Sequence, residues 1–110
     1  MDINKYRKQK IAVVIPYYNA EKHIIDVISK LPDYLYAVII VDDKSPQPLP
    51  KEKIETIINP QIKYYFLENE INLGVGGATK KGFMYAMNND IDIVIKVDAD
   101  DQMDLSYIPN

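Results

Sequence analysis

Residues 91–102 read IDIVIKVDADDQ, an apolar, β-branched run that passes directly into a group of carboxylates. Residues 38–45 show the same arrangement as VIIVDDKS. Continuous apolar runs of this length are typical of strands that are covered on both faces of a parallel sheet. Two such strands ending in adjacent acids predict a sheet whose carboxyl edge gathers negative charge. A cation or hydrogen-bond donors must offset that charge, and we interpret the pattern as a site for a divalent metal and a nucleotide.

The rest of the chain alternates expected strands and helices. We expect strands at residues 11–15, 37–41, 62–67 and 91–97, and helices at residues 24–31, 51–58 and 74–88. Pro16 is expected to end the first strand and Asn19 to cap the first helix. Phe83, Met84 and Met87 are expected to face inward from the last helix. This order predicts an α/β fold with a parallel sheet, in which ligands bind beyond the carboxyl ends of the strands.

Composition narrows the classes of function. A chain of 110 residues fits one domain with a real core but is small for a complete enzyme of this kind. The net charge of −3 gives no basis for binding nucleic acid or an anionic membrane surface. The apolar run 11–15 is too short for a signal peptide or a transmembrane segment. The absence of cysteine excludes disulfides and thiolate metal sites and is compatible with a cytoplasmic location.

The acids after the last expected strand suit a metal site. If the strand stays extended, Asp98 and Asp100 point to one side and Ala99 to the other. Gln102 continues the same alternation and adds a neutral oxygen. Such hard oxygen ligands suit Mg²⁺ or Mn²⁺, which take further ligands from a substrate diphosphate. The alternative is a solvated acidic turn that caps a following helix.

The acids after the second expected strand also allow two interpretations. Asp42 and Asp43 either begin a turn before the proline-rich stretch 46–50, or they place a carboxylate where it accepts a hydrogen bond from a nucleobase N–H. The acids at 98–102 are expected at the same edge of the sheet, and this supports the interpretation of Asp42 or Asp43 as a nucleobase contact.

The glycine-containing segment 72–79 is a poor dinucleotide-binding fingerprint, because Thr79 occupies its third glycine position. The alternative is a flexible entry into a helix. Lys80 and Lys81, one turn later, either lean towards a phosphate or are solvated. His23 is the single histidine, so no histidine-based metal site or catalytic pair is assembled here.

Four motifs, in this order and at this spacing, resemble family-2 glycosyltransferases. They are residues 11–21 (IAVVIPYYNAE), 38–45 (VIIVDDKS), 72–83 (NLGVGGATKKGF) and 98–103 (DADDQM). The last motif is similar to that of the dolichol- or polyprenyl-phosphate sugar synthase branch. The resemblance implies a GT-A fold, here its Rossmann-like, nucleotide-binding half, truncated after the Asp-x-Asp motif. It further implies transfer of a sugar from a nucleoside diphosphate, with inversion.

The resemblance also implies roles for individual residues. Roles in nucleotide-sugar binding fall on Pro16, Tyr18, Glu21, Asp42, Asp43, Gly74, Lys80, Asp98 and Ala99. Roles in binding Mg²⁺ or Mn²⁺ fall on Asp98, Asp100 and Gln102. Lys44 and Asp101 depart from the family pattern, since both stand where glycine is common.

The expected domain spans residues 1–110 and is incomplete at its C-terminal end. In relatives, the general base and the acceptor-binding segments follow the Asp-x-Asp motif. We therefore expect the general base beyond Asn110, assign no catalytic residue in this chain and expect the chain to be inactive alone. The implied donor is a UDP- or GDP-linked sugar, and the acceptor is a polyprenyl phosphate or a cell-envelope glycan. We expect a cytoplasmic location, at the inner face of the membrane in a longer protein, and self-association through an exposed face.

Two other classes of protein share this pattern. A sugar nucleotidyltransferase would need a glycine-rich phosphate loop with a basic residue after the first strand, where residues 16–19 read PYYN. A non-catalytic nucleotide-binding module would bind a nucleotide with a metal but without turnover.

Overall fold

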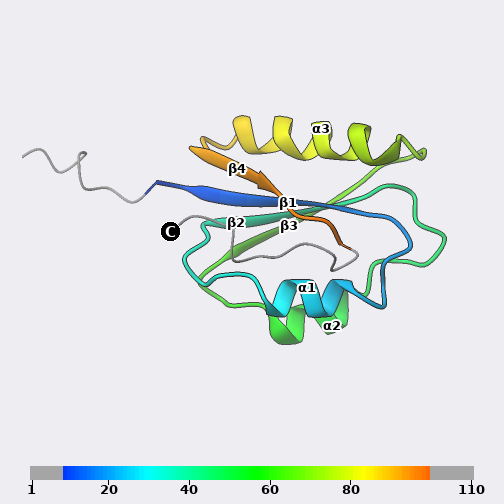
Figure 1. The fold of residues 1–110 in the computed structure, drawn as a ribbon, viewed down its shortest axis with the longest axis horizontal. Helices are drawn as coiled ribbons and strands as arrows, with labels where there is room; N and C mark the ends of the chain where they lie inside the picture. Colours follow the sequence, from blue (N-terminus) through cyan, green and yellow to red (C-terminus); the bar gives the residue numbers. More distant parts are fainter. Residues whose placement is uncertain (1–8, 100–110) are drawn as a thin grey trace, which may run out of the picture.

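The computed structural model describes residues 9–99 and confirms an α/β fold with a parallel sheet (Figure 1). In chain order the elements are β1 (Ile11–Tyr17), α1 (Ile24–Ser29), β2 (Ala37–Asp42), α2 (Lys51–Ile57), β3 (Lys63–Glu68), α3 (Gly74–Met87) and β4 (Ile93–Lys96). The strands form one four-stranded sheet in the order β3-β2-β1-β4, and every neighbouring pair is parallel. In the described part of the chain, no helix has the length and apolar character that a membrane span requires.

The sheet is covered on both faces, by α3 on one and by α1 and α2 on the other (Figure 1). All seven residues of β1 are buried, and they alternate between the two layers. Val13 and Ile15 belong to the core under α1 and α2, whereas Ala12 and Val14 belong to the core under α3. Burial on both faces explains why the central strands are continuous apolar runs rather than alternating ones.

Helix α3 packs against the sheet through its small residues, not through its methionines. Ala78, Gly82 and Ala86 are its buried residues, and they recur at intervals of four on one face. The expectation that Met84 and Met87 face inward is wrong, because both are more than half exposed. A stripe of small side chains lets the helix axis lie close to β1. Phe83, which was also expected to face inward, is partly buried against the same core.

Two predicted boundaries also differ from the structure. Pro16 does not end β1 but pairs with Val41 inside it. The carbonyl of Val14 accepts a hydrogen bond from the N–H of Val97, so the backbone groups of every second β1 residue, Pro16 included, point towards β4. β4 pairs with β1 only as far as Val14 and ends before it reaches Pro16. The missing N–H of the proline therefore costs no ladder bond. The N-cap position of α1 is His23 rather than Asn19, and its side chain makes no capping hydrogen bond.

Candidate functional site

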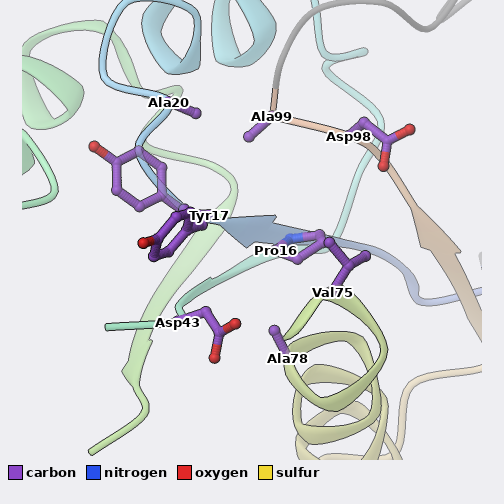
Figure 2. Close-up of a pocket in the computed structure, with 9 residues that line it drawn as sticks. Pro16, Tyr17, Ala20, Asp43, Val75, Ala78, Asp98 and Ala99 are labelled. Atoms are coloured by element: carbon purple, nitrogen blue, oxygen red, sulfur yellow. The ribbon is translucent and has the colours of Figure 1, made fainter. Parts of the chain in front are cut away.

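A cavity of about 150 Å³ lies at the carboxyl edge of the sheet (Figure 2). It is lined by Pro16, Tyr17, Tyr18, Ala20, Asp43, Val75, Ala78, Asp98 and Ala99. These residues come from the ends of β1 and β2, the first turns of α3 and the segment after β4. Because β2 and β4 lie on opposite sides of β1, the strand order reverses at this place. Open α/β sheets bind their ligands in the crevice at such a reversal.

Asp43 is held in the cavity wall by hydrogen-bond donors from the segment before α3. The residue is 3% exposed. Its Oδ1 accepts hydrogen bonds from Asn69 Nδ2 and from the backbone N–H of Leu73, each at 2.8 Å. A buried carboxylate is costly unless donors compensate for lost water, and these two donors meet that need.

Asp42 lies outside the cavity, although the sequence predicted the same role for Asp42 and Asp43. It continues the alternation of β2 on the face towards α2, and its Oδ1 accepts a hydrogen bond from the N–H of Ser45 at 3.0 Å. It lines a separate open hollow together with Glu68 and Glu70. The structure therefore brings Asp43, and not Asp42, to the predicted site.

Asp98 and Ala99, in the segment that follows β4, both line the cavity. Ala99 is buried with Val97 in the core under α1 and α2, whereas the Asp98 side chain is partly exposed, so the two residues take different faces as expected although both line the cavity. Lys96 Nζ lies 3.3 Å from Asp98 Oδ1, in an ion pair whose two side chains are both partly exposed.

Several predictions fall on the part of the chain that follows Ala99. Asp100 and Gln102, the other predicted metal ligands, lie outside the described residues. Asn110, beyond which the general base is expected, lies outside them as well. The predicted metal ligands and the expected position of the base therefore stay predictions.

Tyr17 contributes a buried hydroxyl that the sequence analysis did not assign. The residue is fully buried, and its hydroxyl has no hydrogen-bond partner among the described residues. Burial raises the pKa of Tyr17 to about 12, and the nearby carboxylates of Glu21 and Asp42 add to the shift. Glu21 does not line the cavity, but its Oε2 is likewise buried without a described partner. Pro16 and Tyr18 line the cavity as predicted.

Two predicted residues on α3 do not reach the cavity. Gly74 begins the helix with φ 79°, and its N–H donates to Asn72 Oδ1 at 3.0 Å. Lys80 does not line the cavity either. Val75 and Ala78 line the cavity in their place.

Asn69 and Leu73, which hold Asp43, were also missed. A signal for Asn69 was present, because it directly follows β3 just as Asp43 directly follows β2.

The cavity carries negative but no positive side chains among the residues that the structure describes. Two carboxylates line it, those of Asp43 and Asp98, and neither a lysine nor an arginine of residues 9–99 does so. A diphosphate bound here would therefore need a cation to offset repulsion. Asp98 fits this need because it is a partly exposed hard oxygen donor. Within residues 9–99 no group of three acidic, histidine or cysteine side chains is close enough to hold a metal, so Asp98 would need further ligands.

Residues 12–110 match the sequence model of glycosyl transferase family 2. The chain belongs to this family. Glycosyltransferase family 2 is the family predicted from the four motifs, and the match reaches all of them.

Two relatives place this family-2 chain among longer proteins. It is 32% identical over 97 residues to an uncharacterized protein of Methanocaldococcus jannaschii, covering 87% of this chain and 42% of that protein. It is 36% identical over 104 residues to the UDP-N-acetylglucosamine–dolichyl-phosphate N-acetylglucosaminyltransferase of Methanococcus voltae, covering 84% of this chain and 41% of that protein. The chain therefore spans about two fifths of the length of these relatives.

Solved structures show the same fold. The structure of S. aureus TarS 1-349 in complex with UDP matches with a TM-score of 0.65 at 26% identity, covering 84% of this chain and 28% of that one. A structure of S. aureus TarS 1-349 matches with a TM-score of 0.64 at 25% identity, covering 89% and 29%. These likenesses confirm that the family-2 chain has the sheet of a GT-A glycosyltransferase.

Proposed function

We propose that this chain is the donor-binding portion of a glycosyltransferase that takes a sugar from a nucleoside diphosphate and transfers it with inversion. The observation that carries the proposal is the cavity at the strand-order reversal, with the carboxylate of Asp43 held in its wall. Family membership supports sugar transfer as the reaction class.

The cavity is the proposed site of the nucleobase. A cavity of roughly 150 Å³ accommodates one six-membered ring, whereas whole drug-sized ligands occupy about 300 Å³ or more. Asp43 accepts a hydrogen bond there from a ring N–H, which uracil and guanine both present. The single-ring size favours a UDP-linked donor over a GDP-linked one. The UDP bound to TarS and the UDP-linked donor in the name of the M. voltae relative support the same choice.

Asp98 is the proposed contact to the diphosphate through Mg²⁺ or Mn²⁺, with Asp100 and Gln102 as further ligands. Such an ion, when bound, would stabilise the charge that develops on the leaving diphosphate. The contribution of Asp98 is a carboxylate at the cavity mouth that can exchange its ion pair with Lys96 for a stronger cation. The negative lining of the cavity supports this metal dependence.

The proposed acceptor is a polyprenyl phosphate, with a cell-envelope glycan as the second possibility. The dolichyl phosphate in the name of the M. voltae relative supports the first. A phosphate acceptor is already anionic and needs no general base, whereas a hydroxyl acceptor needs one. With a phosphate acceptor, the residues of this chain would bind and orient the donor without supplying a catalytic base. We place the reaction in the cytoplasm, at the inner face of the membrane.

The proposal is tested by thermal unfolding of the 110-residue chain with UDP, GDP and CDP, each with and without Mn²⁺. A nucleotide at one hundred times its Kd stabilises the folded state by about 2.7 kcal/mol, which is readily measured. We expect UDP to raise the melting temperature only with Mn²⁺. Asp98→Asn should abolish this rise, whereas Asp33→Asn, which removes the same charge from a position outside the cavity, should retain it. If no nucleotide raises the melting temperature at about 10 mM, a practical upper limit of concentration, the proposed function is refuted.

A further inference from the structure

The segment between β3 and α3 is fastened to the end of β2 by a set of hydrogen-bond donors. Asn69 donates from its backbone to the carbonyl of Asp42 and from Nδ2 to Asp43 Oδ1, each at 2.8 Å. The N–H of Leu73 donates to the same Oδ1 at 2.8 Å, and Asn72 Nδ2 donates to the carbonyl of Asp43 at 3.2 Å. Within the described chain, both bonds to the Asp43 carboxylate therefore fall on one oxygen.

The orientation of the Asn69 amide follows from this arrangement. An ionised carboxylate only accepts hydrogen bonds, so Asn69 must turn its NH₂ group, not its oxygen, towards Asp43. Asn69 is 6% exposed, which leaves it little access to alternative partners in water. The Leu73 donor is a backbone N–H, which, unlike a side-chain amide, cannot flip to present an acceptor. Two fixed donors thus meet Oδ1, while Oδ2 is left for a group inside the cavity.

We propose that Asn69 is a positioning residue. Together with the N–H of Leu73 it holds Oδ1 at position 43, and so fixes which polar atom of that side chain faces the nucleobase. The inference rests on the proposed function of the cavity and deepens it. Held by Oδ1, Asp43 offers an acceptor, so the preferred base presents a ring N–H, as uracil does. Cytosine presents a ring acceptor at the same place and is disfavoured.

Asp43→Asn reveals this control because an amide, unlike a carboxylate, has two different ends. The donors of Asn69 and Leu73 would hold the amide oxygen at the place of Oδ1. The NH₂ group would then take the place of Oδ2 and point a donor at the base. That donor opposes the ring N–H of uracil and matches the ring acceptor of cytosine. The substitution therefore reverses the base preference instead of only weakening binding.

The role of Asn69 appears when its donor is removed in the same background. In Asp43→Asn/Asn69→Leu one donor remains, the N–H of Leu73, so the amide is held less firmly and either end can face the base. We therefore expect the double variant to bind the two bases with nearly equal affinity. A merely structural role for Asn69 would lower stability and affinity for both nucleotides equally. Asn69→Ser, whose short hydroxyl side chain lacks the amide donor, replaces Asn69→Leu should the latter variant not fold.

The test measures the Kd of UDP and CDP for the 110-residue chain with Mg²⁺, by ligand-observed NMR, which detects millimolar binding. We expect the unsubstituted chain to favour UDP about tenfold, the equivalent of about 1.4 kcal/mol. Asp43→Asn should favour CDP, and the double variant should show less than a threefold preference (about half of that energy). Asp42→Asn, which removes the same charge beside the cavity, should keep the preference for UDP.

Each failure has a distinct meaning. If the unsubstituted chain binds neither nucleotide, the proposed function is wrong and the inference falls with it. If that chain binds UDP but Asp43→Asn weakens UDP and CDP equally, the inference alone is wrong. A full reversal that persists in the double variant would assign the control to Leu73 and overturn the role of Asn69.

Discussion

The close approach of α3 to β1 gives the sharpest test of the packing. A Cβ atom added at Gly82 would overlap Val14 Cγ1 and lie 3.2 Å from Val14 Cγ2. Val14 is fully buried in β1, and a β-branched side chain has few alternative rotamers. A Cβ added at Gly76, in the same helix, would meet nothing within 4 Å. Gly82→Ala and Gly76→Ala therefore make the same chemical change, one in a crowded place and one in an open place.

The expected difference follows from two opposing effects. Alanine is favoured over glycine within a helix by about 1 kcal/mol, and this gain largely cancels when the two variants are compared. Overpacking a core by one methyl group costs about 1–3 kcal/mol. Gly82→Ala should therefore be less stable than Gly76→Ala by about 1–3 kcal/mol. With a urea m-value of about 1–2 kcal/mol/M, its unfolding midpoint should be lower by about 0.5–3 M.

The assay is urea unfolding of both variants and of the corresponding Val14→Ala double variants. If the overlap with Val14 is the cause, Val14→Ala should suppress the cost of Gly82→Ala and leave the effect of Gly76→Ala unchanged. Equal midpoints for Gly82→Ala and Gly76→Ala would refute the close packing of α3 on β1. A cost that survives Val14→Ala would refute Val14 as the contact.

Three further outcomes are expected. Lys44 has φ 61°, and Lys44→Gly should raise the urea midpoint because the left-handed conformation costs a non-glycine residue about 1–2 kcal/mol, more than the added chain entropy. An unchanged or lower midpoint would contradict this. Tyr17 has its pKa raised to about 12, so the unfolded chain loses this proton first as the pH rises, and stability should fall between pH 10 and 12. The pH dependence of the urea midpoint should be flatter in Tyr17→Phe, and an identical alkaline decline in both proteins would exclude Tyr17 as its source. Met84→Ser/Met87→Ser should reduce any self-association measured by sedimentation, because both side chains form exposed apolar surface on α3; an unchanged sedimentation profile would place the contact elsewhere.

The order and type of the elements could be predicted because the strands are runs of β-branched residues, or of aromatic ones in β3, bounded by turn signals. The inward face of α3 could not, because hydrophobicity marks Met84 and Met87, whereas close packing on β1 depends on small residues such as Gly82. The end of β1 was missed for a related reason. Pro16 is tolerated because the neighbouring strand β4 ends short of it, and the length of a neighbour is a property of the tertiary structure.

The location of the cavity could be predicted, since acids that follow parallel strands must meet at one edge of the sheet. The choice between Asp42 and Asp43 could not, because adjacent residues differ only in the face that they take. The donors to Asp43 were missed because nothing in the sequence pairs Asn69 with a residue 26 positions earlier.

The central claim is that the carboxyl edge of this sheet binds a uridine nucleotide. The most direct test is a titration of isotope-labelled 110-residue chain with UDP and Mg²⁺, followed by two-dimensional NMR. We predict saturable shifts of backbone amide signals at Tyr18, Asp43, Val75 and Ala99, which surround the cavity. Signals near Lys10, at the opposite edge, should not move. Saturable shifts centred on that opposite edge, or no shifts at millimolar UDP, would contradict the account.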